Sequence, residues 1–163
     1  MKIYIMRHGP AEDQAPTGRD YDRKLTSSGR ARTELAAREL GQWEHPKRVL
    51  SSPLVRTVET AEVVIASLGL DFDFETRDEL APGGDALRLL GELATHGAKR
   101  VIVIGHEPDV SSLAALLLPS WSRSFDKAMI VGLKIARASL AQRTKDSTPA
   151  KLRFVIDAKR LHN

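Results

Sequence analysis

Arginine and histidine residues follow two of the most apolar segments of this chain. Arg7 and His8 come directly after residues 3–6, and His106 follows residues 101–104 with one glycine between them. Both segments are rich in residues that favour strands buried on both faces. Arginine and histidine are unfavourable to bury without partners, and ligands of open α/β sheets bind at the carboxyl ends of strands. The pattern therefore predicts a ligand site at one edge of a sheet.

A second arginine, Arg56, lies at the expected start of a helix. Ser52 followed by Pro53 is typical of a helix N-cap and first helical position. Apolar residues at helical spacing predict the buried face of this helix: Leu54, Val58, Ala61, Ile65 and Leu68. Arg56 lies off that face in the first turn, where a helix favours anions over cations. A cation at this position predicts that an anion binds beside it.

Together these side chains have the chemistry of a phosphoryl-transfer site. The guanidinium groups of Arg7 and Arg56 offer paired donors that match a phosphoryl group. Of the two imidazoles, a neutral one can attack phosphorus and a protonated one can hold an oxygen. A metal site is disfavoured, because no His-x-x-x-His spacing occurs and two arginines would repel a divalent cation. The sequence also has neither a Gly-x-Ser-x-Gly elbow nor a P-loop.

The same residues form motifs that resemble those of the histidine phosphatase superfamily, which has the phosphoglycerate mutase-like fold. Three motifs occur in the order typical of that family: Arg7-His8-Gly9, Ser52-Pro53-x-x-Arg56-Thr57-x-x-Thr60-Ala61 and Gly105-His106. Further motifs resemble the small SixA-type phosphohistidine phosphatases: Ile5-Met6-Arg7-His8-Gly9, Arg23-x-Leu25-Thr26-x-x-Gly29 and Glu79-Leu80-x-Pro82-x-Gly84-Asp85. The resemblance spans most of the chain.

The resemblance implies a role for each matching residue. His8 would be the nucleophile and would form a phosphohistidine intermediate. Arg7, Arg56 and His106 would bind the phosphoryl group, and Arg23, in the loop after the first strand, would be an accessory contact. No metal and no organic cofactor is implied. The implied partner is a phosphorylated substrate, above all a protein that carries phosphohistidine.

Glu79 is the expected proton donor, because larger members of the family carry a general-acid glutamate after the middle strand. As a donor it must hold a proton near neutral pH, so we expect burial to raise its pKa. A solvated loop glutamate is the alternative. Only 20 residues separate Leu80 from Val101, enough for one helix but not for a helical lid. The site should therefore lie open to a bulky substrate.

The rest of the sequence predicts a three-layer α/β/α fold with a mainly parallel central sheet and a closing pair of strands. The predicted helices cover residues 29–42, 53–68, 86–95 and 108–118, and the predicted strands cover residues 3–6, 47–50, 72–75, 101–104, 129–136 and 152–158. We expect the first helix to bury Ala36, Leu40 and Trp43, and Asp85 to cap the third. Residues 142–151 form a polar connection.

The whole chain of 163 residues is expected to be one domain, residues 1–163. Its net charge of +4 favours anionic substrates, but the charges are scattered, so we expect no nucleic-acid partner. There is no cysteine, which excludes disulfides and thiol chemistry. No signal-peptide core and no apolar run of about 18 residues is present, so we expect no membrane association and a cytoplasmic location.

Dephosphorylation of a protein phosphohistidine is the leading interpretation. A broader phosphomonoesterase, acting on a small metabolite or a phosphoprotein ester, and a phosphate-binding module without turnover are the alternatives. A mutase is disfavoured, because returning the phosphoryl group to a bound product favours a closed site that excludes water.

Overall fold

The computed structural model describes residues 1–142 and 147–161, which form a six-stranded sheet in the order β3-β2-β4-β1-β5-β6. The strands are β1 (Lys2–Arg7), β2 (Arg48–Ser51), β3 (Glu75–Thr76), β4 (Arg100–Gly105), β5 (Ile130–Lys134) and β6 (Lys151–Ile156). Strands β1 to β4 pair in parallel, whereas β5 runs antiparallel to both β1 and β6. The sheet is therefore mainly parallel with a closing pair, as predicted.

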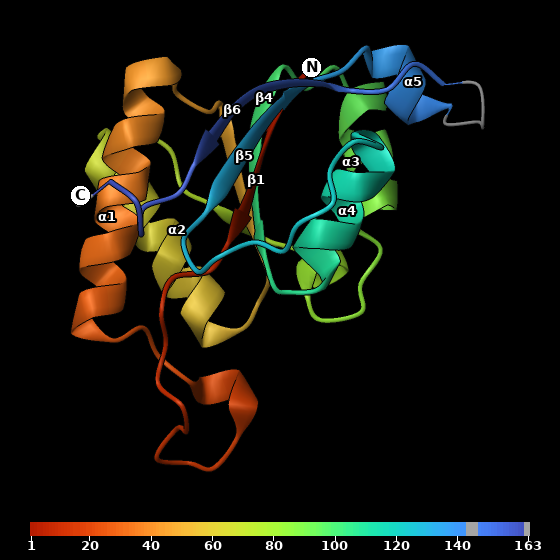
Figure 1. The fold of residues 1–163 in the computed structure, drawn as a ribbon. Helices are drawn as coiled ribbons and strands as arrows, with labels where there is room; N and C mark the ends of the chain where they lie inside the picture. Colours follow the sequence, from red (N-terminus) through yellow and green to blue (C-terminus); the bar gives the residue numbers. More distant parts are fainter. Residues whose placement is uncertain (143–146, 162–163) are drawn as a thin grey trace.

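Helices cover both faces of this sheet. They are α1 (Ser27–Trp43), α2 (Val55–Leu68), α3 (Ala86–Thr95), α4 (Asp109–Leu117) and α5 (Arg137–Ala141). Helices α1 and α2 lie on one face, and α3, α4 and α5 lie on the other (Figure 1). Side chains of β1 alternate between two apolar clusters, one with Ile3 and Ile5 and the other with Tyr4 and Met6. This arrangement confirms the three-layer α/β/α prediction.

Helix α2 begins two residues later than predicted, and its N-cap is Leu54 rather than Ser52. The backbone N–H of Ser52 donates to the carbonyl of Ile104, which continues the pairing of β2 with β4. The Ser52 hydroxyl lies 2.8 Å from His106, and its bond to the turn that follows is a long one of 3.4 Å from the N–H of Leu54. Ser52 therefore extends the strand, and the helix starts beyond Pro53.

The buried face of α2 also differs from the prediction, since three of its five expected positions are only partly buried. The buried residues within the helix are Arg56, Thr57, Thr60, Ala61 and Val64. The hydroxyls of Thr57 and Thr60 donate to the backbone carbonyls of Leu54 and Arg56 at 2.6 and 2.7 Å. These bonds satisfy polar groups in the interior, so α2 turns a polar face inward, which the spacing of its apolar residues does not predict.

Two predictions near the edges of the sheet are wrong. Trp43 was expected in the core, but it is 50% exposed and stacks on Phe154 of β6 with ring centroids 4.9 Å apart. The strand expected over residues 72–75 is reduced to β3. The Asp73 carboxylate accepts from the N–H of Phe74, a local bond that competes with strand pairing. Part of the predicted polar connection, residues 143–146, lies outside the described residues.

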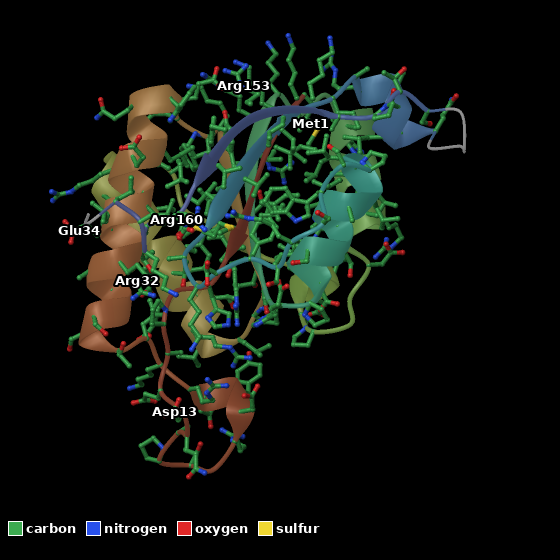
Figure 2. The ribbon with its side chains drawn as sticks, in the orientation of Figure 1. Met1, Asp13, Arg32, Glu34, Arg153 and Arg160 are labelled. Atoms are coloured by element: carbon green, nitrogen blue, oxygen red, sulfur yellow. The ribbon has the colours of Figure 1, made fainter. Side chains whose placement is uncertain are left out.

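A long loop leaves the carboxyl end of β1 and extends beyond the sheet before α1 begins (Figure 1). It contains a 3₁₀ turn, Asp20–Asp22, and an isolated bridge between Ala11 and Leu25 at its base. Asp13 lies on this loop, at the opposite end of the molecule from Met1 (Figure 2). The loop thus stands at the sheet edge where the sequence predicts the site. Within the described residues, no helix is both long enough and apolar enough to span a bilayer.

Candidate active site

His8 and His106 lie side by side at the carboxyl ends of β1 and β4. The parallel register pairs Arg7 with Gly105, and the N–H of His8 continues it by donating to the Gly105 carbonyl at 3.1 Å. The two imidazole centroids are 5.3 Å apart, with the ring planes inclined by 55°. Both side chains are buried, with exposed fractions of 6% and 3%. The structure thus brings together the two histidines that the sequence places at neighbouring strand ends.

The His8 ring is held with one nitrogen free to react. Its Nδ1 lies 2.7 Å from the carbonyl oxygen of Gly9, and because a carbonyl only accepts, Nδ1 must donate. In the neutral ring the other nitrogen, Nε2, then keeps its lone pair. Burial lowers the pKa of His8 to about 3. The hydrogen bond to Gly9 opposes this shift, and the charges of His106, Arg56 and Arg7 add to it. The imidazole is therefore neutral at pH 7, the form that a nucleophile needs.

Gly9 allows three elements to meet behind this ring. Its N–H donates to the hydroxyl of Thr60 on α2 at 3.1 Å. A Cβ at this position would lie 2.3 Å from the hydroxyl oxygen of Thr33 on α1 and 3.1 Å from the carbonyl oxygen of Gly29. Since a side chain at residue 9 would push α1 away, glycine is required for the close approach that fixes His8.

Arg56 is buried, with 5% of its surface exposed, although it lies off the predicted core face of its helix. Its Nη1 and Nη2 donate to the backbone carbonyl and the carboxylate of Asp20, at 2.9 and 3.0 Å. The same carboxylate accepts from Arg23 at 2.8 Å, the main cause of a lowered Asp20 pKa. Asp20 therefore joins two of the predicted phosphoryl-binding arginines. The sequence does not predict this link, because nothing in the charged cluster at residues 19–24 distinguishes Asp20 from the other charged residues.

Of the six buried polar side-chain atoms that have no hydrogen-bond partner among the described residues, three belong to predicted site residues. They are Nε of Arg7, Nε of Arg56 and Nδ1 of His106. The terminal Nη1 of Arg7 donates to the Phe125 carbonyl at 2.7 Å, which anchors that side chain. Buried polar groups are rarely left unsatisfied, and these three come from three separate motifs. Two charged donors and an imidazole nitrogen suit an anion with several oxygen atoms.

His106 is held through its other nitrogen. Its Nε2 lies 2.8 Å from the hydroxyl oxygen of Ser52, a contact that the sequence analysis missed by assigning Ser52 to helix capping. Burial lowers the pKa of His106 to about 4, helped by Arg56 and opposed by Asp109 and Asp20. Both imidazoles are thus neutral at pH 7, and the arginines carry the positive charge of the site.

Glu79 lies near the site, but the prediction of a raised pKa is wrong. Glu79 and His106 line one small cavity. The Glu79 carboxylate accepts from Arg77 and Arg88, each at 2.9 Å. The hydrogen bond from Arg77 is the main cause of its lowered pKa. The two guanidinium groups therefore keep Glu79 ionised at neutral pH, which is unsuited to a proton donor.

One helix follows the middle strands on the side of Glu79. Between Leu80 and β4, a stretch that is described throughout, the chain forms α3, which packs on the sheet. Asp85 caps α3 as predicted, accepting from the N–H of Arg88 at 2.9 Å. No helical lid is present in that stretch, as expected. In the described part of the chain, no three His, Asp or Glu side chains gather as a metal-binding group.

Comparisons with known proteins agree with this geometry. The model of the histidine phosphatase superfamily (branch 1) matches residues 3–81. An uncharacterised protein of Picosynechococcus is 33% identical over an alignment of 151 positions, and the match covers 88% of this chain and 91% of that protein. The phosphohistidine phosphatase SixA of Escherichia coli is 39% identical over an alignment of 123 positions, and the match covers 73% of this chain and 75% of SixA.

A solved structure of the protein histidine phosphatase SixA, complexed with tungstate, has the same fold. It superposes with a TM-score of 0.85 at 31% sequence identity, and the match covers 99% of each chain. The predicted phosphoglycerate mutase-like fold is thereby confirmed. The chain therefore belongs to the histidine phosphatase superfamily and is a phosphatase.

Proposed function

We propose that this phosphatase removes the phosphoryl group from a phosphohistidine of a protein, by way of a phosphorylated His8. The observation that carries the proposal is a neutral His8 with a free Nε2 beside three buried polar atoms without partners. The SixA relatives support it, since they are phosphohistidine phosphatases by name and one binds tungstate. Tungstate is a tetrahedral oxyanion like phosphate.

In the first step, Nε2 of His8 attacks phosphorus, and the bond from phosphorus to the substrate nitrogen breaks. Arg7 and Arg56 neutralise the phosphoryl oxygens, His106 donates to one of them, and Arg23 is an accessory contact. Each guanidinium about 4 Å from a unit negative charge contributes about 4 kcal/mol at an effective dielectric constant of 20. Charged donors that are already in place stabilise the transition state without reorganisation.

The leaving group favours phosphohistidine over an alkyl ester. A phosphorylated imidazole that carries a proton on its second nitrogen leaves as neutral imidazole, so the enzyme need not supply a proton. An alkoxide must be protonated as it leaves, yet Glu79 and Asp20 both have lowered pKa values. A site whose nearby carboxylates are ionised therefore suits an imidazole leaving group better than an alkoxide.

In the second step, water attacks the phosphorylated His8. The bond between Nε2 and phosphorus breaks, inorganic phosphate leaves and the neutral imidazole is restored. The fully described stretch between Leu80 and β4 forms α3 and no lid, which suits a substrate carried on a protein better than a small metabolite that the enzyme must enclose.

The test compares turnover of a phosphohistidine protein, a phosphoserine peptide and p-nitrophenyl phosphate. We expect the phosphohistidine protein to be hydrolysed with the highest kcat/KM. His8→Asn should abolish turnover, and the trapped wild-type adduct should be labile in acid and stable in base, as a phosphoramidate is. Comparable kcat/KM for all three substrates would instead indicate a broad phosphomonoesterase.

Two further measurements examine the roles of the cations. Arg56→Lys keeps the charge but loses the paired donors, and should lower kcat/KM by about 10²-fold, the effect of removing one oxyanion donor. Adding EDTA should leave activity unchanged, since the arginines are proposed to neutralise the phosphoryl charge. Loss of activity in EDTA that zinc or magnesium restores would contradict that assignment.

A further inference from the structure

Ser52 is fully buried at the end of β2, and its hydroxyl oxygen lies 2.8 Å from Nε2 of His106. Its backbone is fixed on both sides. The N–H donates to the Ile104 carbonyl at 3.0 Å, and the Ser52 carbonyl lies 2.9 Å from the Thr57 hydroxyl, whose single hydrogen it shares with the Leu54 carbonyl. The hydroxyl is therefore held against the imidazole by the sheet on one side and by α2 on the other.

The surroundings of this hydroxyl decide where its hydrogen points. The Leu54 N–H donates to the Ser52 oxygen at 3.4 Å, a long bond that uses an acceptor position. Among the described residues, the other hydrogen-bond partner of that oxygen is Nε2 of His106. A buried, neutral imidazole nitrogen can accept, so the single hydroxyl hydrogen of Ser52 is directed to Nε2.

A neutral imidazole carries one hydrogen, and the nitrogen that accepts from Ser52 cannot carry it. The hydrogen of His106 must then be on Nδ1, the buried atom that has no partner among the described residues. We propose that Ser52 is a positioning residue whose hydroxyl fixes the His106 tautomer that presents Nδ1–H to a phosphoryl oxygen. This inference rests on the function proposed above, which supplies the phosphoryl group.

The consequence is that His106 binds the phosphoryl group as a neutral donor. A protonated imidazole could also hold a phosphoryl oxygen, but it would add a third positive charge beside Arg7 and Arg56. A fixed Nδ1–H provides the hydrogen bond without that charge. Without the Ser52 hydroxyl, both tautomers of the ring become accessible, and one of them turns a lone pair toward the phosphoryl oxygen.

The test is nitrogen-15 NMR of the full chain with labelled histidine, at pH 7.5 and without phosphate. Signals of His106 are assigned by their loss in His106→Gln. In the wild type, Nε2 should give the signal of an unprotonated acceptor and Nδ1 that of a protonated nitrogen. Ser52→Ala should give averaged signals from two tautomers, and Ser52→Thr, which keeps the hydroxyl, should restore the wild-type pattern.

Binding of inorganic phosphate, measured by calorimetry, is the second readout. Ser52→Ala should weaken it about tenfold, the scale of one hydrogen bond. Ser51→Ala is the matched control, because Ser51 is equally buried and its hydroxyl donates to the Ser52 backbone carbonyl. The control should keep both the tautomer and the affinity for phosphate.

A wild-type protein with the hydrogen on Nε2 of His106 would overturn the proposal. The proposal would also be wrong if Ser52→Ala kept the wild-type tautomer and affinity for phosphate, or if Ser51→Ala lost as much affinity for phosphate as Ser52→Ala. Turnover of a phosphohistidine protein tests the proposed function separately. If the wild type binds inorganic phosphate and shows Nδ1–H but does not hydrolyse phosphohistidine, the proposed substrate is wrong and the assignment of Ser52 stands.

Discussion

Acid should destabilise this fold through the two histidines of the site. Burial lowers the pKa of His8 to about 3 and that of His106 to about 4, from 6.5. In the unfolded chain both rings bind a proton as the pH falls below 6.5, whereas in the folded chain they stay neutral until the pH nears 4. The unfolded state binds more protons in this window, so stability is fully present above pH 6.5 and is lost as the pH falls toward the folded pKa values.

The size of the effect follows from the two pKa values. Each ring lowers the free energy of unfolding by about 1.4 kcal/mol per pH unit within the window. At pH 5 each ring has therefore removed about 2 kcal/mol, and the pair about 4 kcal/mol, which is a large part of the 5–15 kcal/mol typical of a domain. Below about pH 4.5, Asp20 and Glu79, whose pKa values are lowered, add a loss of the same sign.

Urea unfolding at pH 7.5 and pH 5.0 measures this loss. His8→Asn can keep the donor to the Gly9 carbonyl, and His106→Gln can keep an acceptor for Ser52, but neither side chain titrates. Each variant should lose about 2 kcal/mol between the two pH values, against about 4 kcal/mol for the wild type. His96→Gln, at the exposed end of α3, is the control and should match the wild type. If His8→Asn or His106→Gln loses as much free energy of unfolding between the two pH values as the wild type does, the replaced ring is not held neutral in the folded protein.

Three further variants test contacts around the site. Glu79→Gln should slow hydrolysis of an alkyl phosphate and of p-nitrophenyl phosphate by the same factor, because an ionised carboxylate donates no proton; a larger loss with the alkyl phosphate would make Glu79 the acid after all. Asp20→Asn should lower the inhibition constant of inorganic phosphate by up to about tenfold, because the Asp20 carboxylate occupies donors of Arg56. A higher inhibition constant would indicate that Asp20 orients that arginine. Gly9→Ala should lower the melting temperature, because its Cβ would meet Thr33 at 2.3 Å; an unchanged melting temperature would show that α1 can yield.

The sequence predicts the fold well where local signals and tertiary packing agree. The apolar runs at residues 3–6 and 101–104 become neighbouring strands whose side chains are buried on both faces. Asp85 caps α3 through the N–H of Arg88, as a side-chain cap should. The position of His8 and His106 follows from the strands, because parallel strands that pair must bring their carboxyl ends to one edge.

The burial of Arg56 could not be predicted from its helix. Periodicity assigns a charged residue to the surface, since an unpaired charge is unfavourable inside. What makes this burial tolerable is Asp20, which lies 36 residues earlier and reaches Arg56 through the loop after β1. That contact depends on the path of a loop, and neither spacing nor composition encodes the path.

The pKa of Glu79 was mispredicted for a related reason. Position in a loop beside the site suggested burial, and burial alone raises the pKa of a carboxyl group. The structure adds two guanidinium groups, of Arg77 and Arg88, whose hydrogen bonds favour the charged form. Arg77 is close in sequence, but whether it turns toward Glu79 depends on the 3₁₀ turn at Asp78–Leu80. Predicting the sign of a pKa shift thus requires knowing the hydrogen-bond partners of the group as well as its burial.

The electrostatics of the site explain how it can be stable without substrate and still attract a dianion. The carboxylate of Asp20 bonds to both Arg56 and Arg23, so part of their charge is compensated within the protein. Nε of Arg56 and Nε of Arg7 stay without partners among the described residues. In the proposed mechanism, a phosphoryl group binds these two Nε donors and competes with Asp20 for the terminal nitrogens of Arg56. The neutral imidazole of His8 then attacks and that of His106 donates, so neither ring adds charge. Because the Asp20 side chain is 63% exposed, water can solvate the carboxylate once it is displaced, so the compensating charge is easily released.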